Sequence, residues 1–145
     1  MIYFVGEYAR QLDDRGRIVL PAKLREKLEG TVYITRAPAE KCLNLYTESE
    51  WENIAEKMRA LPTGIDKNAA KFQRKLFGKA SCCEVDKQGR ISLTDELMQY
   101  AGLKKDVVLV GMNTKLEIWD ADLWNDMDTD DDVILEGIMN YNINI

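Results

Sequence analysis

The side chains best suited to chemistry in this chain are aspartates and arginines that flank a glycine in two short segments. They are Asp13, Gly16 and Arg17, and then, 73 positions later, Asp86, Gly89 and Arg90. Aspartate binds backbone N–H groups within turns, and glycine accepts a positive φ, so each segment is predicted to be a tight turn. Such a turn brings each carboxylate to the guanidinium four residues on. A carboxylate fixes the plane of an arginine fork, which suits bidentate recognition of phosphate or guanine.

The repetition extends well beyond the two turns. At the same offset, residues 43–46 match 116–119, and Trp51 matches Trp124. Repeated units of this size bury a full core only by packing on one another, so the chain is predicted to pair two halves. Trp51 and Trp124 are predicted to anchor the cores of the two copies.

The elements that must position the turns are short strands and helices. In the first half we expect strands at 2–5, 8–12, 17–20, 32–35 and 42–46. A helix over 21–28 would bury Ala22, Leu24 and Leu28, and a helix over 48–60 would begin with a capping box from Thr47 to Glu50. In the second half we expect strands at 82–86, 90–93, 106–111 and 115–119, a helix over 95–101, and a helix that begins at Asp120.

The resulting fold class is mainly β with short helices (α+β). Its predicted parts are a first repeat (1–60), a linker and basic helix (61–78), a second repeat (79–127) and an acidic tail (128–145). Within the tail, the acidic run 128–132 precedes a weakly amphipathic helix over 133–139. In the basic helix, Lys67, Lys71 and Lys75 would face outward, while Phe72 and Leu76 would pack inward.

The charge is distributed unevenly along the chain. The net charge is −5, but residues 116–145 hold nine acids and no base, which leaves residues 1–115 with all 20 bases and a net charge of +4. The local field decides whether a polyanion is attracted, so the basic body remains compatible with nucleic acid. The three cysteines lack a CxxC spacing and are predicted to be buried and reduced, which indicates the cytoplasm. No apolar run is long enough to predict a membrane span.

The residues in and around the two turns form a specific sequence pattern. Residues 12–25 read LDDRGRIVLPAKLR and residues 85–91 read VDKQGRI. A DxxGR turn followed by a strand, a proline and a short helix resembles the SpoVT–AbrB swapped-hairpin DNA-binding unit. Two such units in one chain resemble the MraZ family, regulators of the cell-division and cell-wall cluster, over residues 1–124. The second copy departs from the pattern, because Gln88 stands opposite Arg15 and Thr94 and Met98 replace the family's Pro and Arg.

The resemblance implies a fold, an assembly and a function. The implied fold is a duplicated swapped-hairpin, double-ψ-like β-barrel with a pseudo-twofold axis within one chain. The implied assembly is a ring-like homo-oligomer, an octamer or similar. The implied function is sequence-specific regulation of transcription, of the chain's own cell-division and cell-wall operon, by binding short direct repeats in double-stranded DNA near the nucleoid. The residues that the family motif or their position assigns to DNA are Arg15, Arg17, Lys23, Arg25, Lys87 and Arg90.

Two of these assignments leave an alternative open. Arg15 is predicted to reach from the tip of the first turn because the motif offers it no acidic partner; in the alternative, Asp13 and Asp86 only cap tight turns and the arginines are solvated. Lys23 and Arg25 could hold phosphates, contacts that position a protein without reading sequence, but an ordinary solvated face fits them equally well.

Other classes of function find little support in the sequence. The chain has no histidine, which excludes Ser-His and Cys-His nucleophiles and histidine metal sites. It has no phosphate-binding glycine motif, and its acidic run lacks the spacing of a calcium loop. We therefore expect no enzyme, cofactor, metal or small-molecule substrate. The alternative function is an antitoxin-like interaction module whose acidic tail binds a protein partner.

Overall fold

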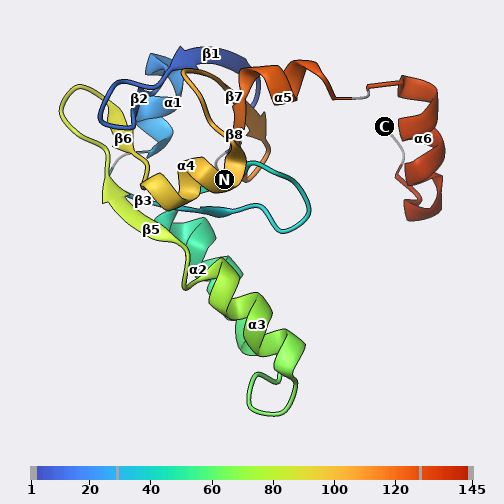
Figure 1. Ribbon diagram of the computed structural model, residues 1–145. Coiled ribbons are helices and arrows are strands. Elements are labelled where there is room, and N and C mark those ends of the chain that lie inside the picture. The colour runs from blue at the N-terminus through green and yellow to red at the C-terminus, as the bar shows by residue number, and fades with distance from the viewer. Residues whose placement is uncertain (1–2, 29, 128, 144–145) are drawn as a thin grey trace.

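The computed structural model describes residues 3–28, 30–127 and 129–143, and it is mostly β with short helices, as predicted (Figure 1). The strands are β1 (Glu7–Gln11), β2 (Arg17–Val19), β3 (Thr31–Arg36), β4 (Leu43–Thr47), β5 (Ser81–Glu84), β6 (Arg90–Ser92), β7 (Asp106–Met112) and β8 (Lys115–Asp120). The helices are α1 (Ala22–Arg25), α2 (Glu48–Arg59), α3 (Lys67–Leu76), α4 (Asp95–Ala101), α5 (Ala121–Asn125) and α6 (Asp131–Ile138).

The main sheet exchanges strands between the two halves. Its order is β1-β7-β8-β4-β3-β5, all antiparallel, so β1 of the first half pairs with β7 of the second and β5 of the second half pairs with β3 of the first. At the centre, β4 pairs with β8 with Asn44 opposite Glu117, which are equivalent positions of the repeat. The order is therefore the same from either end, as a pseudo-twofold axis requires.

A second, two-stranded sheet lies on the same pseudo-axis. β2 pairs with β6, and Ile18 lies opposite its repeat equivalent Ile91. Leu20 N–H donates to Gly89 O at 2.8 Å, and Leu93 N–H donates to Gly16 O at 2.9 Å. Each turn is thereby hydrogen-bonded to the strand of the other half.

The core lies under the sheet and is built from both halves. The most completely buried side chains include Ile18, Leu20, Leu24, Leu43, Leu45, Ile91, Leu97, Leu109, Leu116 and Ile118. Burying one such side chain is worth about 1.5–3 kcal/mol, so neither half retains this core without the other.

Several sequence-based expectations for local structure are wrong. The predicted strand at 2–5 is absent from its described residues: Phe4 forms one isolated bridge to Asn113, and Gly6, at φ +97°, turns the chain into β1. The helix over 21–28 breaks after Arg25 into a 3-10 turn (Glu26–Leu28), and Ala22 is exposed rather than buried. Only the side of this segment that carries Leu24 and Leu28 meets the core.

The tryptophans and cysteines also differ from expectation. Trp51 and Trp124 are half-buried and anchor peripheral clusters rather than the main core: Trp51 stacks on Tyr33 at 5.1 Å, and Trp124 packs on Trp119 at 5.7 Å. Cys42 is buried, and burial raises the pKa of its thiol to about 12. Cys82 is exposed, because it lies on a strand where alternate side chains face solvent.

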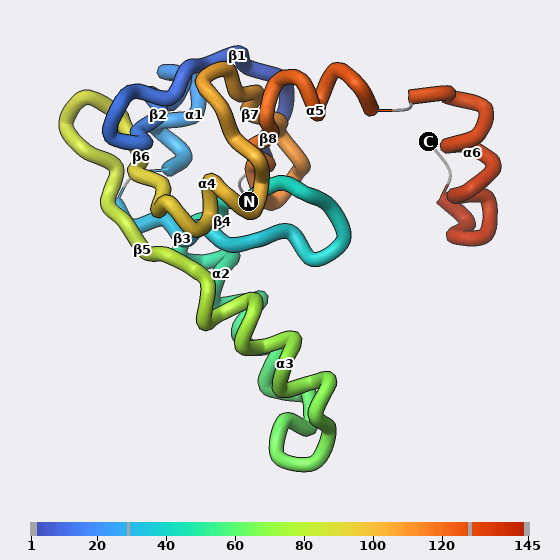
Figure 2. The backbone as a smooth tube through the Cα atoms, in the orientation of Figure 1, coloured from blue at the N-terminus to red at the C-terminus, as the bar shows by residue number. Residues whose placement is uncertain are grey.

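Two parts of the chain extend from the β body in different directions (Figure 2). Helices α2 and α3 form an antiparallel arm. Helix α3 is capped at its N-terminus by Asp66, whose carboxylate accepts the N–H of Asn68 at 2.8 Å. Helix α6 lies beyond α5 and begins two residues earlier than predicted, because the Asp130 carboxylate accepts the N–H of Asp132 at 3.0 Å. No helix within the described ranges is long and apolar enough to cross a membrane.

Candidate nucleic-acid interface

The first turn is closed by hydrogen bonds to one aspartate. Asp13 Oδ1 accepts the backbone N–H of Arg15 at 2.9 Å and of Arg17 at 2.8 Å, while Oδ2 accepts Nε–H of Arg17 at 2.7 Å. Gly16 adopts φ +72°, a conformation that costs a residue with a Cβ about 1–2 kcal/mol. The predicted contact between the carboxylate and the guanidinium is therefore present.

The second turn repeats this geometry. Asp86 Oδ1 accepts the N–H of Gln88 at 3.0 Å and of Arg90 at 2.8 Å, and Oδ2 accepts Arg90 Nε–H at 2.7 Å. Gly89 adopts φ +75°. Because the two segments share residue types and spacing, the same short-range hydrogen bonds produce the same turn twice.

Both aspartates are held in the charged form. The backbone N–H of Arg17 lowers the pKa of Asp13 below its ordinary value, and the guanidinium of Arg17 adds to this effect. The pKa of Asp86 is lowered in the same way, first by the backbone N–H of Arg90. Each carboxylate therefore stays ionised at neutral pH and keeps its arginine in place.

The two turns differ in what they leave for a ligand. Arg15 is exposed, and its side chain forms no hydrogen bond or ion pair within the described part of the chain. The Nη atoms of Arg17 likewise form no hydrogen bond or ion pair in those residues. In the second turn Gln88 occupies the position of Arg15, and its Oε1 accepts Arg90 Nη2–H at 3.2 Å. Arg90 is thus partly satisfied within its own turn, while the exposed Lys87 beside it forms no hydrogen bond or ion pair with any residue that the structure describes.

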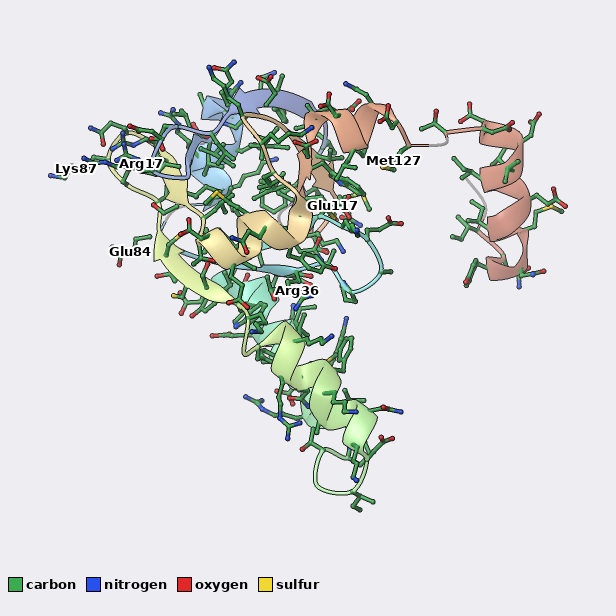
Figure 3. All side chains as sticks on the ribbon, in the orientation of Figure 1. Arg17, Arg36, Glu84, Lys87, Glu117 and Met127 are labelled. Atoms are coloured by element: carbon green, nitrogen blue, oxygen red, sulfur yellow. The ribbon has the colours of Figure 1, made fainter. Side chains whose placement is uncertain are left out.

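The two turns share one end of the molecule. The β2–β6 pairing places Val19 opposite Arg90 and Arg17 opposite Ser92. Figure 3 shows Arg17 and Lys87, one from each turn, at this end. Six of the predicted residues, Asp13, Arg15, Arg17, Asp86, Lys87 and Arg90, therefore form one surface, which we call the turn surface.

Arg25 lies beside the second turn, although it follows the first in sequence. Its Nε–H donates to Leu20 O at 2.9 Å, and its guanidinium lies so close to Gly89 that a Cβ there would clash with it. The repeat equivalent of Arg25 is Met98, and it packs on the other turn, where a Cβ on Gly16 would lie 2.9 Å from Met98 Cε. Arg25 is thus half-buried and positioned by the turn, whereas Lys23 is exposed on α1.

Two cations near the first turn were not identified from the sequence. Lys105 comes from the second half, yet it lines a hollow of about 750 Å³ with Asp13 and Gly16, because the backbone N–H of Leu12 donates to Lys105 O at 2.8 Å. Arg10 Nε–H donates to Val19 O at 3.0 Å. Lys105 lies near the first turn because β1 pairs with β7 of the other half, and no local sequence pattern predicts that pairing.

The basic helix does not extend the turn surface. Helix α3 projects from the body away from β2 and β6 (Figure 1). Within residues 3–28, 30–127 and 129–143, no group of three or more His, Cys, Asp or Glu side chains is arranged to hold a metal ion.

Comparison with known protein families gives one result. A family model described as "MraZ protein, putative antitoxin-like" matches residues 3–75 and, a second time, residues 76–132. The two matches together span most of the chain, and they reproduce the duplication seen in the sequence and in the sheet.

Proposed function

This chain belongs to the MraZ family, and on that basis we propose that it is a sequence-specific DNA-binding regulator of transcription that uses its two DxxxR turns. The observation that carries the proposal is the turn surface, where two arginines are each fixed by an ionised aspartate at 2.7 Å. An arginine whose plane is already fixed loses less freedom when it binds a phosphate or a guanine edge.

The two turns would make different kinds of contact with DNA. Arg15 and Arg17 present unsatisfied N–H groups and would contact base edges, while Lys23 and Lys105 would contact phosphates beside them. In the second turn Arg90 shares its donors with Gln88, so Lys87 and Arg25 would mainly position the backbone of the DNA.

The proposed assembly rests on membership of the family, and each protomer would contribute one turn surface to it. A ring-like homo-oligomer, an octamer or similar, would present several identical surfaces to several sites. Direct repeats spaced near one helical turn, roughly 10 base pairs, would match such an array. The proposed target lies upstream of the chain's own cell-division and cell-wall operon, and the protein would act in the cytoplasm at the nucleoid, without a cofactor.

The test is binding of the full chain to DNA from upstream of its own gene. Affinity should fall as salt rises, with a log–log slope of about −0.9 for each phosphate contact. Footprinting should protect short repeats, and a scrambled fragment of equal length should bind more weakly. Equal affinity for both fragments, or an affinity independent of salt, would contradict the proposal.

A second candidate function is supported by the family description and by the tail. The family is described as antitoxin-like, and α6 exposes Val133, Ile134 and Leu135. In this alternative the tail binds and neutralises a protein partner. A chain that ends at residue 127 distinguishes the two functions. A regulator that contacts DNA through its turns should still bind its operator without the tail, whereas binding of a protein partner through the tail should be lost.

A further inference from the structure

The C-terminal helix α6 exposes an apolar surface that the rest of its own chain does not cover. Its exposed apolar residues, with those just after it, are Val133, Ile134, Leu135, Ile138, Met139, Tyr141 and Ile143. Helix α6 has eight residues and includes Gly137. Isolated helices shorter than about 12–15 residues are marginal in water, and glycine weakens them further. Helix α6 therefore requires a surface to pack on.

A groove with matching properties lies at the base of the α2–α3 arm. It consists of two adjoining hollows of about 290 and 380 Å³ that share Pro38 and Tyr100. The first hollow is lined by Phe72 and Leu76 of α3, and the second extends to Met127, at the root of the tail. Figure 3 shows Arg36 near the arm and Met127 at the far end.

The floor of the groove is apolar, and most of its charged side chains are positive: Arg36, Lys41 and Lys75 line it together with one carboxylate, Glu40. Phe72 is 38 % exposed, which is unusual for a large aromatic ring on a helix. Arg36 lies over the ring of Tyr100 at 4.0 Å, and the Tyr100 hydroxyl donates to Ala37 O at 2.8 Å, which holds the ring in place. Neither Arg36 nor Lys75 forms an ion pair with any residue that the structure describes.

Helix α6 carries the complementary pattern. Ile134, Leu135 and Ile138 lie on one face, at spacings of one and four residues, and Asp132 and Glu136 lie along one edge of that face. Asp131 lies at the N-terminal end of the same face. Residues 128–145 contain five acids and no base, whereas residues 67–79 contain five bases and no acid. An apolar stripe with acids at its N-terminal end and along one edge would pack on Phe72 and Leu76 and bring its carboxylates to Arg36 and Lys75.

We propose that α6 of one protomer docks into this groove on a second copy of the chain. Among residues 129–143, none lines the groove of its own chain, and α6 lies apart from the arm (Figure 1). The contact joins different surfaces of two copies, which is the kind of interface that closes into a ring. The inference rests on the homo-oligomeric part of the proposed function and is independent of DNA binding.

Cross-linking between two populations of the full chain tests the contact. In a Cys82→Ser, Cys83→Ser background, chains with Leu135→Cys are mixed with isotope-labelled chains carrying Phe72→Cys. Oxidation should produce a mixed-label disulfide dimer of twice the 16.6 kDa chain mass. The matched control is Ile65→Cys, 91 % exposed at the tip of the arm, which should give less than a tenth of that product.

A doubly substituted chain distinguishes docking between copies from docking within one chain. A Phe72→Cys, Leu135→Cys chain that closes on itself at monomer mass, with no mixed-label dimer in the first experiment, would overturn the proposal. So would equal cross-linking at Ile65→Cys.

Light scattering gives an independent measurement. Leu135→Asp and Phe72→Asp should each raise the dissociation constant of the assembly at least tenfold, whereas Ile65→Asp should leave it unchanged. A stable assembly that neither Leu135→Asp nor Phe72→Asp weakens would overturn the docking contact alone. A wild-type chain that is monomeric at micromolar concentration would overturn both the contact and the ring, and DNA affinity, measured separately, would still report on the turn surface.

Discussion

At the scale of single residues, the turn surface depends on how many N–H groups of each arginine are already used. Arg17 and Arg90 both donate Nε–H to an aspartate, which leaves the outer edge of each guanidinium for a ligand. Arg90 gives part of that edge to Gln88, whereas Arg17 does not. The difference arises from one substitution between the repeats, Arg15 against Gln88, and it makes the first turn the stronger candidate for base contact.

Arg15→Ala tests that role directly. The side chain is exposed and forms no hydrogen bond or ion pair within the described ranges, so the melting temperature and the mass of the assembly should stay at wild-type values. Each lost bidentate base contact should cost about 1–3 kcal/mol of binding free energy. Gln88→Ala is the matched substitution in the second turn and should have a smaller effect. Wild-type affinity of Arg15→Ala for its operator would remove the first turn as the element that contacts bases.

Arg17→Ala should act on stability as well as on DNA affinity. It removes the Nε–H that Asp13 Oδ2 accepts at 2.7 Å and leaves the carboxylate with backbone donors alone. We expect a lower melting temperature, in contrast to Arg15→Ala, and weaker DNA binding. An unchanged melting temperature would show that the ion pair does not contribute to folding.

The lowered pKa of Asp13 predicts an acid-sensitive contribution to stability. Because the folded-state pKa lies below the ordinary value of 3.8, the carboxylate stabilises the fold above pH 3.8, and this contribution is lost as the pH falls through the folded value. Asp13→Asn should therefore lower the urea midpoint at neutral pH and approach the wild type below pH 3.8. Glu84→Gln, an exposed carboxylate, is the control. A deficit of equal size at both pH values would contradict the prediction.

At the scale of elements, each turn is supported by the opposite half of the chain. Gly16 packs under Met98 of α4, and Gly89 packs under Arg25 of α1. The strands β2 and β6 add the backbone hydrogen bonds that hold both turns together. We therefore expect a change in either turn to affect the other repeat as well as its own.

Gly89→Ala tests this mutual support. An alanine there would adopt φ +75° and would meet the guanidinium of Arg25, so we expect a loss of more than about 1 kcal/mol in the free energy of unfolding. Gly64→Ala is the matched control, because no atom lies within 4 Å of its added Cβ. Equal stability of the two variants would show that the Arg25 contact does not constrain the second turn.

At the scale of the whole molecule, the exchange of β1 and β5 makes the two halves interdependent. A chain that ends at residue 78 lacks β7, the partner of β1, and loses half of the core. It should fold only by pairing with a second copy that supplies the equivalent strand, since β3 occupies the repeat position of β7. Circular dichroism and light scattering over a range of concentrations should show folding coupled to dimerisation. A folded monomer of this fragment would contradict the exchange.

The local geometry of the site could be derived from the sequence. Asp13, Gly16 and Arg17 form their turn through hydrogen bonds that span at most four residues, so residue type and spacing determine it. The same holds for the helix caps at Thr94 and Asp120, which accept Leu97 N–H and Leu123 N–H. The duplication itself, and the mostly β composition, also follow from patterns that recur along the chain.

The tertiary structure alone determined which repeat supports which turn. Arg25 lies on the second turn and Lys105 beside the first because β1 and β5 pair across the two halves, and that pairing depends on burial of a shared core. The same long-range packing buries Phe4 in the main core and leaves Phe72 exposed in the groove. A pattern within one segment contains no information about which distant segment will cover it, so these contacts are decided by the competition among all surfaces for burial.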